Sequence, residues 1–208
     1  MAGSGASSPT ARCRDGSYSF SQHRSGTCSH HGGVAQWLTP GSVPPPSGTS
    51  PPAAPPVGHT VLIGSRTLAS GCTRGAEPDR RCSPGAYYSG LTASVICSST
   101  FRTGTIRDVP QAEKFAVERE YGMTARLYGR TIEIDHIVAL ELGGSNDIAN
   151  LFPEPGSGAA NYHVKDRVEN RAHDLVCAGK LGLNAARVSM AVDWEALYRR
   201  LFGVDTGQ

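Results

Sequence analysis

A proline-rich segment limits the folds open to this chain more than any other feature of its sequence. Residues 39–57 contain eight of the 14 prolines and show no periodic apolar face. Clustered prolines hold a backbone near polyproline II and are excluded from the interiors of helices and sheets. The sequence therefore predicts a linker here, with a small module at 11–38 before it and a larger domain at 58–204 after it.

The small module is too short to bury a core of its own, so it needs a covalent or metal staple. A disulfide between Cys13 and Cys28 is the expected staple, and the alternative is a zinc site that adds His30 and His31. The module contains the pattern D-G-S-Y-S followed by R-S-G-T-C-S-H-H-G-G-V. On this pattern it resembles a small bacterial module of unknown function, which implies no activity.

Six cysteines form an even set with no C-x-x-C pair, which favours disulfides over zinc ribbons. Pairing nearest neighbours gives Cys13–Cys28 and Cys72–Cys82 and leaves Cys97–Cys177. Disulfides are typical of exported proteins, so we expect a secreted or cell-envelope protein. The first eleven residues lack the basic and apolar regions of a signal peptide. The alternative is a cytoplasmic protein with six reduced thiols.

Charge and hydropathy exclude several classes of protein. Charged residues make up 18% of the chain, and 20 Lys and Arg against 18 Asp and Glu leave a net charge of +2. This balance excludes a strongly basic nucleic-acid tail and charge-driven disorder, although a local basic patch is still enough to bind nucleic acid. No apolar run approaches the roughly 18–20 residues that a membrane span needs.

The larger domain shows the patterns of an α+β fold. Apolar and polar residues alternate in predicted strands, and helical periodicity marks predicted helices. The predicted strands lie at 60–63, 131–138 and 150–152, and the predicted helices lie at 111–121, at 162–177 and from about 184 onward. For the last helix, the pattern predicts Asn184 as the cap and Val188, Val192 and Leu201 facing the core, with Trp194 and Tyr198 beside them.

Polar residues suited to hydrolysis gather around one predicted strand end. Asp135 and His136 are adjacent, and adjacent strand residues point to opposite faces, so the two should have different roles. An imidazole with a pKa near 6.5 is suited to activate water at neutral pH. A divalent cation with few protein ligands keeps open positions for a phosphate oxygen and a water.

The segment D-H-I-V-A-L-E-L-G-G-S-N-D-I-A-N-L, with K-D-R-V-E after it, resembles the HNH or ββα-metal endonucleases, in particular a small exported bacterial subgroup. The resemblance implies a ββα-metal core with additional helices. It implies that His136 is the general base, that Asp135 is a metal ligand, and that Asn150 orients the hairpin and the base. The second metal ligand would be His163, with Asn161 as the alternative.

The resulting expectation is a metal-dependent endonuclease that hydrolyses phosphodiester bonds of DNA, with RNA as the alternative substrate. The cofactor would be a single Mg²⁺ ion, replaceable by Mn²⁺ or another divalent ion. Lys165, Arg167 and Arg171 would either grip phosphates or lie solvated on an exposed helix face. An immunity protein would be a partner if the chain is a toxin. The rival hypothesis is a non-catalytic protein that binds nucleic acid or the cell envelope with the same fold.

Overall fold

The computed structural model of the chain describes residues 9–14, 18–19, 27–28, 34–38, 56–123 and 131–203. The chain divides into two compact units, residues 1–53 and 54–208. Helices and strands are both present, so the mixed α and β character predicted from the sequence is confirmed. Most of the predicted linker, together with His30 and His31, lies outside the described residues.

The first unit contains a small antiparallel sheet in the order β2-β1-β3. Its strands are β1 (Ala11–Cys13), β2 (Tyr18–Ser19) and β3 (Val34–Trp37). Cys13 is bonded to Cys28, and these two residues pack with Ala11 and Val34 in the buried cluster of this unit. So small a cluster provides little hydrophobic stabilisation, which is why the predicted disulfide matters here.

The second unit contains two antiparallel strand pairs and the described helices of the chain. Its strands are β4 (Thr60–Leu62), β5 (Ala86–Tyr88), β6 (Ile132–His136) and β7 (Leu151–Pro155). Its α-helices are α1 (Ala93–Ile96), α2 (Gln111–Glu120), α3 (Tyr162–Cys177) and α4 (Leu183–Phe202). Short 3-10 turns are η1 (Thr103–Thr105), η2 (Leu140–Leu142) and η3 (Ile148–Asn150).

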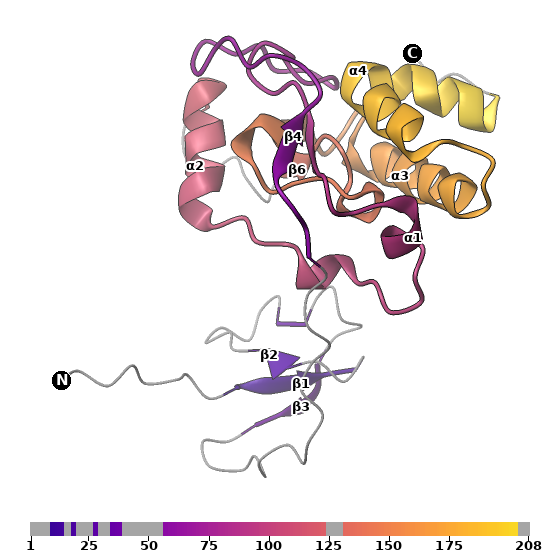
Figure 1. Ribbon diagram of the computed structural model, residues 1–208. Helices are drawn as coiled ribbons and strands as arrows, with labels where there is room; N and C mark the ends of the chain where they lie inside the picture. Colours follow the sequence, from indigo (N-terminus) through magenta and orange to yellow (C-terminus); the bar gives the residue numbers. More distant parts are fainter. Residues whose placement is uncertain are drawn as a thin grey trace. The chain divides into compact units, whose positions relative to one another are not determined.

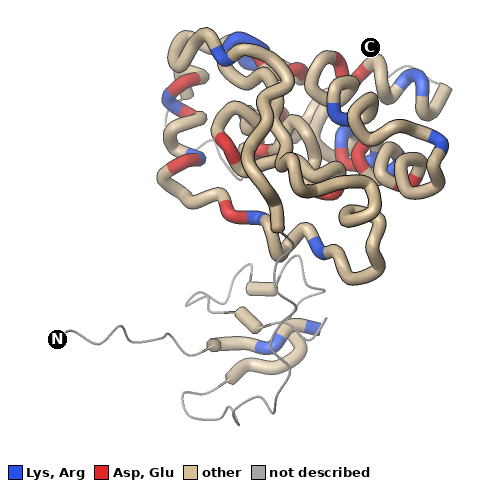
Figure 2. Tube along the Cα trace, in the orientation of Figure 1, with Lys and Arg blue, Asp and Glu red and all other residues tan. Residues whose placement is uncertain are grey.

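Helices cover the β6–β7 pair on two sides. In Figure 1, α2 lies to the left of β6, and α3 and α4 pack side by side to its right. Trp194, Phe152, Leu91 and Met190 are among the fully buried side chains between these elements. Figure 2 shows basic and acidic residues interleaved along α2 and α3, so both signs of charge occur along each helix.

The connection between β6 and β7 depends on two consecutive glycines, Gly143 and Gly144. Gly143 adopts a left-handed φ of 79°, and a Cβ atom on Gly144 would lie 1.8 Å from the carbonyl oxygen of Val138. Only glycine tolerates so close an approach of two backbone segments. The turn returns the chain so that β6 and β7 pair over five residues in register, from Ile132–Pro155 to His136–Leu151.

The predicted core face of the last helix is wrong for Val188 and Val192, whereas Leu201 packs against the core and Trp194 and Tyr198 are buried. Helix α4 begins at Leu183 after Gly182, so Asn184 is not its cap. Val188 and Val192 are 38% and 42% exposed. The buried stripe is instead made of residues spaced by three and four positions, namely Ala186, Met190, Trp194, Leu197 and Tyr198. The backbone departs from helical geometry at Asp193, which changes the direction of the helix.

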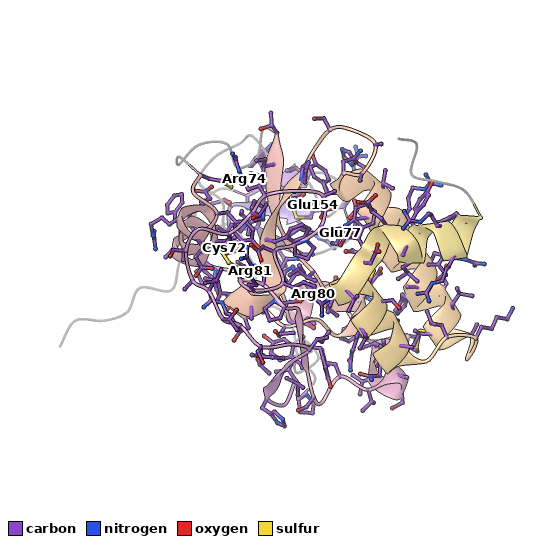
Figure 3. The ribbon with its side chains drawn as sticks, turned by 90° about the horizontal axis from the view of Figure 1, so that it is seen from above. Cys72, Arg74, Glu77, Arg80, Arg81 and Glu154 are labelled. Atoms are coloured by element: carbon purple, nitrogen blue, oxygen red, sulfur yellow. A yellow bond between two sulfur atoms is a disulfide. The ribbon has the colours of Figure 1, made fainter. Side chains whose placement is uncertain are left out.

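The three predicted disulfides, Cys13–Cys28, Cys72–Cys82 and Cys97–Cys177, are all formed. They indicate folding in an oxidising environment. Figure 3 labels Cys72 and Arg81 in the loop before β5, which contains no helix or strand from 71 to 85. Among the described helices, none is long and apolar enough to cross a membrane.

Candidate functional site

Strand β6 places Asp135 and His136 on opposite faces, as the alternation of a strand requires. Asp135 is paired across the sheet with Phe152, and His136 is paired with Leu151. Cross-strand partners share a face. Asp135 and Phe152 both contact Lys165 of α3, so their face is the one covered by that helix. His136 lies on the other face and contacts Asn146.

A buried lysine occupies the space between the hairpin and α3. Lys165 is 1% exposed, and its Nζ lies 2.5 Å from Oδ2 of Asp135, 2.5 Å from Oε1 of Glu169 and 2.8 Å from the backbone oxygen of His136. Oε2 of Glu154 lies 3.5 Å away. Figure 3 labels Glu154, which is 0% exposed. We call Lys165, Asp135, Glu154 and Glu169 the Lys165 cluster.

The charges in the Lys165 cluster are set by competition between burial and pairing. Burial raises the pKa of Asp135, but the charge of Lys165, the charge of His136 and hydrogen bonds from both residues together lower it to about 2. Burial raises the pKa of Glu169 to about 8 despite Lys165. Burial, together with the charge of Asp135, also holds the pKa of Glu154 well above its usual range, and a proton on Glu154 allows a hydrogen bond to Asp135. Lys165 therefore pairs most strongly with Asp135, while Glu154 and Glu169 take up protons more readily than exposed carboxyls.

His136 is held as a neutral imidazole of defined tautomer. It is 3% exposed, and burial, with a smaller contribution from Arg107, lowers its pKa from 6.5 to about 4 although Asp135 opposes the shift. The Nδ2 of Asn146 donates to the backbone oxygen of Ile106 at 2.6 Å, which fixes Oδ1 of Asn146 as the acceptor facing His136. Nε2 of His136 therefore carries the proton, and Nδ1 keeps the basic lone pair.

Asn150 organises the hairpin through hydrogen bonds to backbone groups rather than through the imidazole. It is 0% exposed, and its Oδ1 accepts hydrogen bonds from the backbone nitrogens of Ala86 and Val138. Its Nδ2 donates to the backbone oxygens of Val138 and Ser145. The hydrogen bond to the imidazole is made by Asn146 instead.

Asn161 and His163, the two residues considered as the second metal ligand, lie at the N-terminal end of α3, where Asn161 is the N-cap. Oδ1 of Asn161 accepts hydrogen bonds from the backbone nitrogens of His163 and Val164, so the atom that would bind a metal already caps the helix. The His163 side chain is exposed, and its ring lies 4.2 Å from that of Tyr162. Of these two residues, His163 is the one whose ligand atoms do not cap the helix.

Further acidic groups surround the outer side of Asp135. Burial raises the pKa of Glu133, and the charges of Asp135 and Asp166 raise it further. Burial and Asp135 likewise raise the pKa of Asp166, whereas His163 and Arg107 lower it. These shifts indicate that Glu133, Asp135, Asp166 and His163 are close enough for their charges to interact.

Sequence reasoning missed several of these residues. Lys165 was expected to grip phosphate or to be solvated, and the structure contradicts both because its ammonium is buried against carboxylates. The spacing of Lys165 and Glu169, four residues apart on a helix, is a usable signal for their ion pair. Asn146 follows the double glycine but has no distinguishing pattern. Arg167 stacks on Phe202, with 5.1 Å from its guanidinium carbon to the ring centre.

A domain family described as "Domain of unknown function (DUF3761)" matches residues 5–38. No curated protein and no solved structure matches the chain. The family match lies over the N-terminal module and assigns no activity to it. Any function of the second unit therefore has to be argued from its own residues.

Proposed function

We propose that the second unit is a metal-dependent, HNH-like endonuclease that hydrolyses phosphodiester bonds of DNA, with His136 as the general base. The observation that carries this proposal is the state of His136. It is neutral at pH 7, its Nε2 hydrogen is directed to Asn146, and its Nδ1 is left as a proton acceptor. The order of β6, β7 and α3, with Asp135 on the helix side, is the arrangement that a ββα core requires.

In this mechanism Nδ1 of His136 removes a proton from the water that attacks phosphorus. A pKa of about 4 makes the free imidazole a weak base. An anionic phosphate beside the ring would stabilise its protonated form and raise that pKa towards neutrality. Arg107 is exposed and lies close enough to His136 to lower its pKa, so it is placed to bind the phosphate.

The outer side of Asp135 carries the kinds of side chain that a divalent ion binds, although no three of them in the described part of the chain have their ligand atoms within 4.8 Å of one another. Lys165 holds Oδ2 of Asp135, and the charge of Asp135 acts on Glu133 and Asp166, while His163 acts on Asp166. These side chains offer oxygen and nitrogen ligands. Carboxylate oxygens are the ligands that Mg²⁺ prefers. Asp135 and His163, with Asp166 beside them, would hold the ion. When bound, it would stabilise charge on the phosphate and on the leaving oxygen.

Burial of His136 favours a second candidate function. Its 3% exposure leaves little surface for a water and a phosphate to reach. A protein that binds nucleic acid or a cell-envelope polymer without cutting it needs no such access. In that case His136 would serve the fold through its hydrogen bond to Asn146.

Plasmid nicking separates the two candidates. The full chain would be incubated with supercoiled DNA in Mg²⁺, in Mn²⁺ and in EDTA, while DNA binding is followed by fluorescence anisotropy. Nicking that requires a divalent ion supports the endonuclease. Binding without nicking in either ion supports the second candidate. Absence of both binding and nicking would contradict the endonuclease and a DNA-binding role, and would leave a cell-envelope polymer as the ligand of the second candidate.

A further inference from the structure

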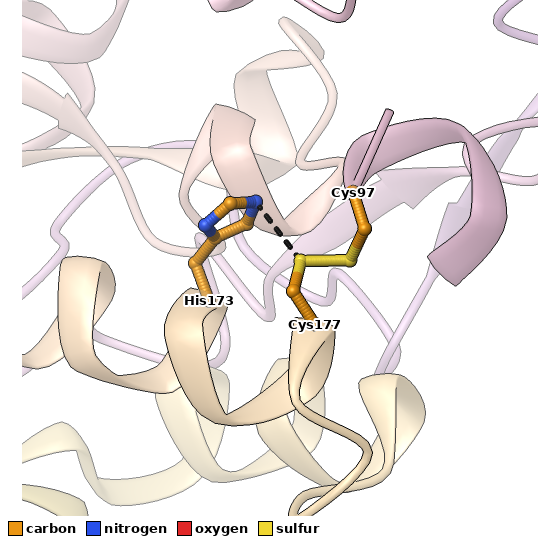
Figure 4. A group of neighbouring side chains, drawn as sticks. All are labelled: Cys97, His173 and Cys177. Carbon is orange, nitrogen blue, oxygen red and sulfur yellow. Dashed lines mark hydrogen bonds between the residues drawn. A yellow bond between two sulfur atoms is a disulfide. The ribbon is translucent and has the colours of Figure 1, made fainter. Parts of the chain in front are cut away.

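Cys97, His173 and Cys177 form a compact group outside the site described above (Figure 4). Cys97 follows the last residue of α1, and Cys177 is the last residue of α3. The disulfide between them joins the two helices across 80 residues of sequence. His173 lies one helical turn before Cys177, and its Nε2 is 3.5 Å from Sγ of Cys177 and 3.3 Å from the backbone oxygen of Ile96.

The spacing of His173 and Cys177 matches two ligands of a tetrahedral zinc ion, whereas the two sulfurs are bonded to each other and can act as separate ligands only after reduction. Zinc binds thiolate sulfur at about 2.3 Å and imidazole nitrogen at about 2.0–2.1 Å, which puts two such ligands roughly 3.6 Å apart. The observed distance from Nε2 of His173 to Sγ of Cys177 is 3.5 Å. One ligand atom from each of the three residues lies within 4.8 Å of the others. Among the described residues, no other group of three His, Cys, Asp or Glu side chains meets this condition.

The surroundings also suit a metal ligand. Cys177 is exposed, so solvent can supply the fourth ligand of a tetrahedral ion. Oε1 of Glu141 is buried and has no hydrogen-bond partner within the described part of the chain. Burial raises the pKa of Glu141, and the nearby His173 partly offsets that shift. A carboxylate beside a ligating histidine is a common outer-sphere partner in zinc sites.

We propose that Cys97, Cys177 and His173 bind a zinc ion when the disulfide between the two cysteines is reduced. A dithiol supplies two electrons and two protons, which break the S–S bond and give two thiols, and the dithiol becomes a disulfide. Zinc then binds both sulfurs as thiolates, and their two protons pass to solvent. The same three side chains would connect α1 to α3 covalently under oxidising conditions and through a metal under reducing conditions.

The site can be tested in the full chain with Co²⁺ as a spectroscopic probe. A phosphine reductant is used, because it does not offer competing thiolates. The reduced wild type should bind one Co²⁺ per chain, with a thiolate-to-cobalt charge-transfer band that Zn²⁺ abolishes. The oxidised chain should show no such band.

Substitutions identify the ligands. Cys97→Ser should abolish the band, while Cys72→Ser, which removes a cysteine of another disulfide, should retain it. His173→Gln keeps all six cysteines, and its fold can be checked by circular dichroism in the oxidised state. It should weaken Co²⁺ binding by more than the roughly 10–100-fold that loss of an outer-sphere partner costs. His59→Gln is the matched control and should bind like the wild type.

Two results would overturn the proposal. One is the absence of a thiolate-to-cobalt band in the reduced wild type. The other is a His173→Gln or Cys97→Ser variant whose Co²⁺ affinity is within about a hundredfold of the wild type, since the substituted residue would then not be a direct ligand. Neither result depends on whether the chain cleaves DNA.

Discussion

Replacing Lys165 by methionine tests the central packing feature of the second unit. Methionine has nearly the length of lysine without its charge, so the substitution removes the ammonium and leaves little cavity. The carboxylate of Asp135 would then face Glu154 and Glu169 with no cation between them. The side chains of Asp135, Glu154 and Glu169 are 16%, 0% and 15% exposed, respectively. Removing one partner from a buried ion pair costs about 3–5 kcal/mol.

The loss of stability should depend on pH. The pKa of Asp135 lies at about 2, below its usual 3.8, so its pairing stabilises the wild type fully above pH 3.8 and is lost as pH falls towards 2. In Lys165→Met, Asp135 takes up its proton at a higher pH, because burial then acts without the ammonium. The difference between wild type and variant should therefore be largest near neutral pH and shrink in acid.

Urea unfolding followed by tryptophan fluorescence measures this difference, because Trp194 is fully buried. With a slope of about 2 kcal/mol per molar urea, a loss of about 4 kcal/mol lowers the midpoint by about 2 M. Lys180→Met is the matched control; Lys180 is exposed, and the change should stay within about 0.5 kcal/mol. A Lys165→Met variant as stable as Lys180→Met would refute the reasoning.

Three further outcomes are expected. Asn150→Ala removes four buried hydrogen bonds and should cost at least about 3 kcal/mol in thermal unfolding; a loss under 1 kcal/mol would show that water replaces them. Asn146→Ala should slow DNA cleavage about 10–100-fold at unchanged DNA affinity, because the protonated ring of His136 loses a hydrogen bond worth about 1.5–3 kcal/mol. An unchanged rate would remove Asn146 from the mechanism. The pKa of His136 is about 6.5 in the unfolded chain and about 4 in the folded chain. Protonation of His136 should therefore lower the free energy of unfolding by about 3 kcal/mol as pH falls across that range. A His136→Gln variant whose free energy of unfolding depends on pH in the same way as that of the wild type would contradict this.

Local patterns were enough to predict the hairpin and the helix after it. The alternation at 131–138, the double glycine and the periodic apolar residues of 162–177 each depend on short-range geometry. Helix α3 has the predicted bounds, β6 is shorter than the predicted strand at 131–138, and β7 extends beyond the predicted 150–152. Cysteine pairing was also predictable, since nearest neighbours left one remaining pair.

Contacts between distant segments were not predictable from such patterns. Burial of Lys165 depends on carboxylates from β6 and β7, which no helical periodicity reveals. The exposed Val188 and Val192 have the same four-residue spacing as the buried Ala186 and Met190, so periodicity alone could not choose the face of α4 that packs.

The account of the candidate site depends most on His136, and single-turnover cleavage of DNA by His136→Gln tests it directly. Loss of a general base should lower the cleavage rate by about 100–10,000-fold, with DNA affinity and the unfolding midpoint in urea close to those of the His59→Gln control. A His136→Gln variant that cleaves within tenfold of the wild type would contradict the account. So would a variant that loses DNA binding and its fold together, because His136 would then be a structural residue.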